Sequence, residues 1–465
     1  MLANIILSEM HQHILSLRLH LTLVLVVLLF GFGTLAYVKS HEADRQRYEQ
    51  YLAELIDSQR NQAENNITRF IIETRSLVLS PRNDSFISDA REKYLPMQFW
   101  YSGYNVFGFD VPSDAANKYM ESYQRLNWMF IVAIIISFAV LVLTYDTASG
   151  EKESRTLALI LSNQVSRGIL LTGKYLSVII TSLLVLLPGI ALSLIILLLT
   201  GTVIVAGSLL AEVTGFLAAV VVFVSCVAAL GLLSSVISKS SNVSLLVCLC
   251  FWLGSVVVVP NAAVFLTNRV FPVESSDSRQ ARIDQARDEI NRNAPPGSWS
   301  SAGGNPFFEG HKLRADNQMN MFMAEKQIKD AWNNELIRQY EGSRLLASIS
   351  PVSLFEFISE AVVGGGYVRL RKEWDDIRNY QSSLINWFKE IDAGDDKSPH
   401  WYNPVESLST TAQGVSWETV PKFTERRPSA SERLAAARLS LAILVLYTAA
   451  AFALSFVLFL RYDVR

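Results

Sequence analysis

Residues 145–175 read YDTASGEKESRTLALILSNQVSRGILLTGKY, a charged, helix-forming segment between two long apolar runs. An acidic cluster opens the segment, and an apolar stripe at helical spacing follows. The segment ends on Arg167 and Lys174, immediately before the next apolar run. A charged, amphipathic helix tied between two membrane spans favours a segment that lies on the membrane surface and contacts a second protein.

Apolar residues make up 50% of the 465-residue chain, and its mean hydropathy is +0.26. Because crossing the hydrocarbon core takes about 20 helical residues, we expect six spans, at 19–38, 127–144, 176–200, 213–237, 243–266 and 439–460. The remaining residues lie mainly in two polar blocks, 39–126 and 267–438, in which strand-like alternation is scarce. The sequence therefore predicts an all-α polytopic membrane protein with a mainly helical outer domain built from two inserts.

Helical patterns continue outside the spans. Residues 1–18 carry apolar side chains at helical spacing, which predicts an interfacial helix on the cytoplasmic face, with an extension of the first span as the alternative. We expect that first span to be a retained anchor rather than a cleaved secretory signal. In the first block we expect a helix from about Glu42 to Leu79, stopped by Pro81, and then an aromatic turn at 96–104. The second block predicts helices at 276–293, 311–346, 351–363 and 367–391.

Basic residues in the short loops set the orientation. Segment 145–175 holds four of them, whereas loop 201–212 has no Lys or Arg. Arg461 and Arg465 lie in the tail 461–465. Because cytoplasmic loops are enriched in Lys and Arg, the sequence predicts a multi-pass protein of the cell membrane with both termini in the cytoplasm. The two polar blocks are then periplasmic or extracellular.

Several function classes find no support in the sequence. The spans contain almost no ionisable residue, which argues against ion-coupled transport. Gly168–Lys174 fits part of a phosphate-binding loop, but Tyr175 replaces the Ser or Thr that would hold magnesium, and the match runs into a span. Metalloprotease, paired-cysteine and serine-hydrolase patterns are absent from the sequence, and a net charge of −2 gives no basic field for nucleic acid. We therefore expect no catalytic site, metal or cofactor on this chain.

Segment 145–175 resembles the cytoplasmic coupling segment of type-2 ABC exporter permeases, and we call it the coupling segment. The matching positions are Glu151, Thr156-Leu157, Leu161-Ser162, Ser166-Arg167 and Gly173-Lys174. Two positions depart from the pattern: Arg155 stands where the family usually has glycine, and Gln164 where it often has proline. Six spans, an N-terminal interfacial helix and a large insert between the fifth and sixth spans are similar to a subfamily with expanded outer domains.

The resemblance implies the permease subunit of an ATP-binding-cassette transporter. Its implied partners are an ATPase subunit, which binds ATP and magnesium, a second permease copy or paralogue, and the lipid bilayer. Export or extraction of a lipid-like or peptide substrate is implied as well. Residues that we expect to contact the ATPase are Glu151, Glu153, Arg155, Thr156, Leu157, Ile160, Leu161 and Arg167.

Two other classes compete with this interpretation. A membrane-anchored sensor or scaffold would use the outer helical domain to bind a ligand or partner, but anchoring needs only one or two spans. A polytopic membrane enzyme would need a catalytic cluster in or near the spans, and the sequence offers none. Recovery of an ATPase chain with this protein would favour the transporter.

Overall fold

The computed structural model describes residues 2–90, 98–110, 126–162, 165–202, 207–296, 309–405 and 413–462. In those residues, six helices are long and apolar enough to cross a membrane. They are Leu17–Asn65, Trp128–Glu153, Arg167–Leu199, Gly207–Ile237, Ser241–Val270 and Ala430–Arg461. The predicted spans fall on these helices, and the all-α polytopic fold is confirmed.

The elements follow one another in a simple order. Before the second span lie α1 (Leu2–Leu15), α2 (Leu17–Asn65), α3 (Ile67–Ile72) and the strands β1 (Arg75–Val78), β2 (Gln98–Tyr101) and β3 (Val106–Asp110). The second span joins α5 (Trp128–Phe130), the π-helix η2 (Ile131–Ile136), α6 (Ser137–Thr144) and α7 (Ser149–Glu153). Next come α8 (Thr156–Ser162), α9 (Arg167–Leu199) and α10 (Gly207–Ile237).

The second half of the chain begins with the fifth span, which comprises α11 (Ser241–Leu253), the π-helix η3 (Gly254–Val258) and α12 (Val259–Val270). Four helices of the second polar block follow: α13 (Ser276–Arg292), α14 (Glu309–Ala347), α15 (Pro351–Val363) and α16 (Gly366–Asp392). The single turn η5 (Trp417–Thr419) precedes the sixth span, α17 (Ala430–Arg461). The four helices α13, α14, α15 and α16 agree with the ranges predicted for the second block to within two residues.

The membrane bundle packs around an apolar core that α2, the second span, α9, α10 and α17 share. Trp128, the first residue of the second span, is buried in this core, where its ring contacts those of Phe30, Phe86 and Phe216 at centroid distances of 5.1–6.0 Å. The indole N–H of Trp128 donates to the Ser193 hydroxyl (2.8 Å), so this buried polar atom is satisfied.

The helix α15 packs into this bundle, although the sequence places it in the second polar block. Eleven of its thirteen residues are buried, and the ring of Phe355 stacks on Phe223 of α10 at 4.4 Å. Ser350 caps the helix, and its hydroxyl also donates to the carbonyl of Ser255 in η3 (2.7 Å). The second block therefore contributes a helix to the core of the spans.

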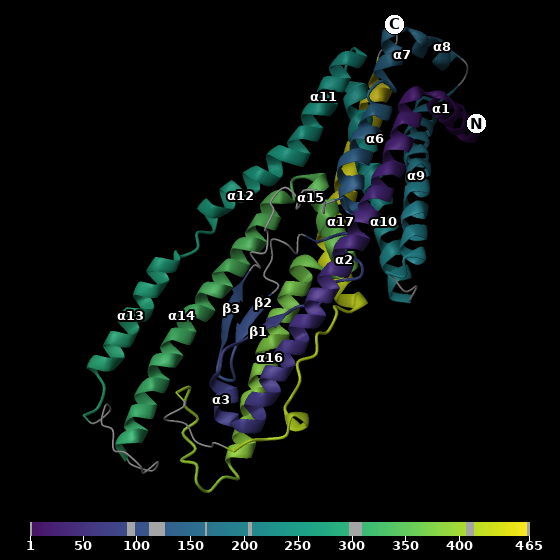
Figure 1. Ribbon diagram of the computed structural model, residues 1–465. Coiled ribbons are helices and arrows are strands. Elements are labelled where there is room, and N and C mark those ends of the chain that lie inside the picture. The colour runs from purple at the N-terminus through teal and green to yellow at the C-terminus, as the bar shows by residue number, and fades with distance from the viewer. Residues whose placement is uncertain are drawn as a thin grey trace.

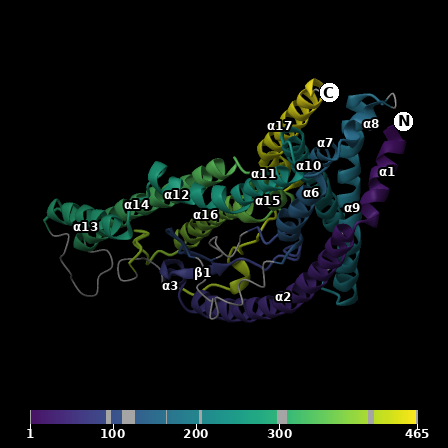
Figure 2. The same cartoon turned by 90° about the horizontal axis from the view of Figure 1, so that it is seen from above.

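The other extramembrane elements form what we call the distal domain: the second half of α2, α3, the sheet, α13, α14 and α16 (Figure 1). One apolar core joins the two polar blocks, with Phe70 and Phe99 from the first and Trp374 and Phe388 from the second. The helices α13 and α14 lie side by side and extend away from the bundle, as Figure 2 also shows.

A three-stranded antiparallel sheet, β1-β2-β3, corrects the expectation of an aromatic turn at 96–104. Of that stretch, residues 98–101 form the central strand, with Trp100 opposite Ser76 on β1 and Gly108 on β3. Residues 96 and 97 lie outside the described residues. Phe99 and Tyr101 point into the distal core, because successive side chains of a strand alternate between its faces.

The helix expected from Glu42 to Leu79 also needs correction. It is continuous with the first span and ends at Asn65. The Asn66 side chain then caps the short α3, and the backbone N–H of Ile67 donates to the carbonyl of Gln413 (2.9 Å). A segment almost 350 residues away in sequence thus binds the backbone immediately after the helix ends, a contact that no local pattern could reveal.

Candidate functional site

The coupling segment folds as two short helices, α7 and α8, at the end of the bundle where α1 and the C-terminus of α17 also lie (Figure 1). The helix α7 extends the second span, and α8 leads towards α9, which begins with the cap Ser166. The described part of the segment therefore lies between the second and third spans and rests against neighbouring spans.

Hydrogen bonds fasten α7 to the turn between α10 and α11. The Ser235 hydroxyl accepts from the backbone N–H groups of Ala148 and Ser149 at 2.9 and 3.0 Å. Lys152 donates to the carbonyl of Val236 at the end of α10. Glu153 accepts from the backbone N–H of Ser241 at the start of α11 (3.0 Å). Displacement of α7 would therefore be passed to the fourth and fifth spans.

A buried ion triad ties α7 to α9 and α1. The Lys174 ammonium lies 2.7 Å from a carboxylate oxygen of Glu9 and 2.8 Å from one of Glu151, and only 5% of its side chain is exposed. Gly173 permits this approach of α1, because a Cβ there would lie 2.7 Å from Ile5. Glu151, one of the predicted contact residues, therefore binds within this chain.

Lys174 was recognised from sequence only as part of a motif and as a loop charge. The signal that could have revealed its role is a lysine about two turns inside a helix that continues into the membrane, since a buried charge requires a partner. Its partner Glu9 lies 165 residues away in sequence.

Arg155 occupies the turn between α7 and α8 with φ = +59°, in the left-handed region. Glycine adopts this conformation without the steric penalty that a side chain brings. The structure thus explains why glycine suits this position, where this chain departs from the resembling pattern. Gln164, the other departure, lies outside the described residues.

The apolar side of the segment divides between the bundle and the surface. Leu157 is 2% exposed and packs in a cluster with Leu170, Leu171 and Phe459, and Ile160 packs against the same cluster. Leu159 is 69% exposed and was not among the predicted contact residues. Glu153, Arg155 and Thr156 are exposed too, whereas nothing is described of the Leu161 side chain.

Arg167 binds the end of the sixth span. Its guanidinium donates to the carbonyls of Leu460 and Tyr462, both at 2.8 Å. Carbonyls at the end of a helix have no partner within the helix, so this arginine caps α17. Its expected contact with an ATPase stays a prediction.

Comparison with known proteins gives one match. The model of the family described as "ABC-2 family transporter protein" matches residues 3–464. No curated protein and no solved structure matches the chain. Within the described residues, no group of three or more His, Cys, Asp or Glu could hold a metal ion. Because the family model spans nearly the whole chain and the structure has the six membrane-spanning helices of a multi-pass protein, the chain belongs to the ABC-2 family of transporter proteins.

Proposed function

We propose that this chain is the permease subunit of an ATP-binding-cassette exporter and that α7 and α8 contact the partner ATPase. Family membership supports the role in membrane transport. The main support for the proposed contact is that the coupling segment has two sides with different surroundings. One side is fastened to α1, α9, α10 and α11, while Arg155, Thr156 and Leu159 stand on the exposed side.

The fastening supports a mechanical role. A force on the exposed side would reach the second and third spans directly and the fourth and fifth through Ser235 and Glu153. Rigid elements of this kind can convert domain closure in a neighbouring subunit into a movement of spans. ATP and magnesium would then act on the partner chain, and this chain would move the substrate.

The proposal includes an orientation and a second permease. The basic residues of the coupling segment support a cytoplasmic position for it and for both termini, with the distal domain outside the cell or in the periplasm. The fifth span is 17% buried in its most apolar window, the lowest value of the six, which leaves a surface for a second permease copy or paralogue. The resembling family pattern favours export of a lipid-like or peptide substrate.

Exchange of the exposed leucine tests the proposed contact. The chain with Leu159→Asp should insert normally but lose the ATPase activity that co-purifies with the tagged native chain. Leu199→Asp serves as the control, because Leu199 is also exposed (82%, against 69% for Leu159) and lies at the end of α9 far from α8. Retention of full activity by the Leu159 variant would refute the contact, whereas loss in both variants would point to a general effect of charge.

A further inference from the structure

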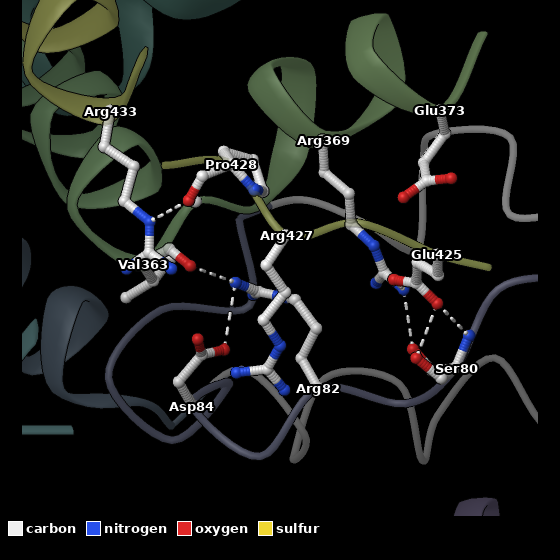
Figure 3. A pocket seen from close by; sticks show the side chains of 11 residues that line it. Ser80, Arg82, Asp84, Val363, Arg369, Glu373, Glu425, Arg427, Pro428 and Arg433 are labelled. Carbon is white, nitrogen blue, oxygen red and sulfur yellow. Dashed lines mark hydrogen bonds and ion pairs between the residues drawn. The ribbon is translucent and has the colours of Figure 1, made fainter. Parts of the chain in front are cut away.

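A polar pocket lies where the distal domain meets the membrane bundle, and we call it the junction pocket (Figure 3). The pocket is open to solvent: the space between its lining atoms and at its mouth is about 310 Å³, of which the centre of a water-sized group can occupy about 10 Å³. Three parts of the chain line it: the loop at residues 80–84, the connection from α15 to α16, and the segment that precedes α17. The coupling segment is at the opposite end of the bundle (Figure 1), so this pocket is separate from the proposed ATPase contact.

Three arginines form a fixed frame around the pocket. Arg369 binds Glu425 and donates to the carbonyl of Ser80 (2.7 Å). Arg433 lies 2.9 Å from a carboxylate oxygen of Glu212 on α10. Arg82 lies 3.0 Å from Asp84 and donates to the carbonyl of Ser88 at 2.7 Å. Each guanidinium is held by an acid and a carbonyl, so the walls are preorganised.

The glycines between α15 and α16 make room for these guanidinium groups. Gly364 has φ = +64°, and a Cβ on it would lie 2.8 Å from Arg433. A Cβ on Gly365 would lie 2.3 Å from Arg82. Since real Cβ atoms do not approach other atoms this closely, both arginines reach the pocket only because glycine occupies these positions.

Two of the charged lining residues, Glu373 and Arg427, form no ion pair with the residues that the structure describes. Glu373 on α16 is 1% exposed, and its Oε2 is buried without a hydrogen-bond partner. Burial, and then the nearby Glu425, raise the pKa of Glu373 to about 8. Arg427 is exposed and makes no hydrogen bond or ion pair with the residues that the structure describes. Figure 3 shows both side chains with no interaction drawn to them.

We propose that the junction pocket binds the headgroup of a zwitterionic phospholipid, with its ammonium at Glu373 and its phosphate at Arg427. An ammonium supplies the donors that the buried carboxyl lacks, and guanidinium groups bind phosphate oxygens in a geometry that suits both. The pocket is at the right depth, because Glu212 and Arg433 lie within the first two turns of the spans α10 and α17. Headgroups of a bilayer lie at this boundary.

Lipid binding to the purified full-length chain tests the proposal. Native mass spectrometry would measure the retention of two phospholipids, phosphatidylethanolamine, which carries an ammonium group, and phosphatidylglycerol, which does not. We expect preferential retention of phosphatidylethanolamine by the wild-type chain. Glu373→Gln should reduce that preference about tenfold, and Arg427→Gln should weaken retention of both lipids. Arg338→Gln and Glu418→Gln exchange exposed residues of the distal domain outside the pocket, and both should behave as wild type.

The acidity of Glu373 adds a second measurement. The empty pocket holds the Glu373 proton near neutral pH, and an ammonium would displace it, so retention of phosphatidylethanolamine should strengthen between pH 6 and pH 9. Glu425, Arg369, Asp376 and Lys372 face the same carboxyl. The Glu373→Gln variant, which has no proton to lose there, should show a flatter profile.

Three outcomes would overturn the proposal. The first is equal retention of the two lipids by the wild-type chain. The second is an unchanged preference in both pocket variants, of which Arg427→Gln alters an exposed side chain and leaves folding intact. In the third, free phosphoethanolamine protects the chain against thermal unfolding at the same concentration as phosphatidylethanolamine does. That result would assign the pocket to a soluble zwitterion instead.

Discussion

The two ends of the bundle both gather basic and acidic side chains, but they differ in how completely these groups are paired. At the coupling end, Lys174 pairs with two carboxylates in a buried triad, in which Oε2 of Glu151 has no hydrogen-bond partner but each carboxylate has a counter-charge. At the junction pocket, three arginines are paired, while Glu373 and Arg427 are left over. Where every charged group has a counter-charge, the network fixes elements in place, whereas charged groups without one leave ion pairs for a ligand to make. The comparison distinguishes a structural joint from the binding site that we propose.

The largest effect is expected from breaking the complete network. Lys174→Met would leave Glu9 and Glu151 buried without their cation, and loss of one partner of a buried ion pair costs about 3–5 kcal/mol. Thermal unfolding of the detergent-solubilised chain, monitored by size-exclusion chromatography, would show a lower midpoint temperature. Adding Glu9→Gln and Glu151→Gln to this variant should recover most of the loss. A midpoint equal to that of the wild type would mean that the triad does not hold α1.

The next effect concerns the frame of the junction pocket. Gly365→Ala would place a methyl group 2.3 Å from the Arg82 guanidinium and should destabilise the chain by about 1–3 kcal/mol. Tryptophan fluorescence recorded during unfolding would measure this destabilisation. Gly207→Ala is the control, because a Cβ there meets no atom within 4 Å. If both variants unfold alike, the glycine is not required for the position of Arg82.

The incomplete network should respond to pH. The pKa of Glu373 is raised, so between about pH 4.5 and pH 8 the folded chain holds a proton that the unfolded chain releases. This group's contribution to stability is therefore full below that window and declines as pH rises through it, by at most about 1.4 kcal/mol per pH unit. Glu373→Gln should flatten the decline in melting temperature between pH 5 and pH 8. Glu418→Gln should retain the wild-type slope, and an unaltered slope in the Glu373 variant would contradict the assignment.

The smallest effect tests the turn in the coupling segment. Arg155→Gly would remove a side chain from a left-handed residue and should stabilise the chain by about 0.5–1 kcal/mol. Ser154→Gly, at the neighbouring position with φ = −81°, should instead destabilise it slightly. Parallel thermal melts would distinguish the two, and a loss of stability in the Arg155 variant would show that its side chain matters more than its backbone.

Local patterns could predict most of the helices. The second block carries strong signals, such as the cap Ser350 followed by Pro351, and the observed α15 begins there. The small sheet was missed because its strands have only four or five residues, too few for alternation to stand out. The end of α2 was missed because the helical pattern continues through Asn66 into α3, where the backbone N–H of Ile67 binds the carbonyl of the distant Gln413.

The candidate sites were less accessible from sequence than the helices. A pattern located the coupling segment, yet the burial of Leu157 and the exposure of Leu159 depend on how α8 rests on the bundle. Lys174 is one of three members of an ion triad, and the other two belong to separate helices. The junction pocket draws on three remote parts of the chain, and neither Glu373 nor Arg427 belongs to a motif.

The helix α2 is continuous over 49 residues, which at 1.5 Å per residue is about 74 Å along its gently curved axis (Figure 2). Near one end, Arg18 binds Asp146 of the coupling segment (3.1 Å), and near the other, Ala63 belongs to the distal core. A rod of this length is a lever: a tilt of about 5° moves its far end by about 6 Å. A small rotation at the membrane surface would therefore swing the distal domain by more than the width of a water molecule, without any element bending.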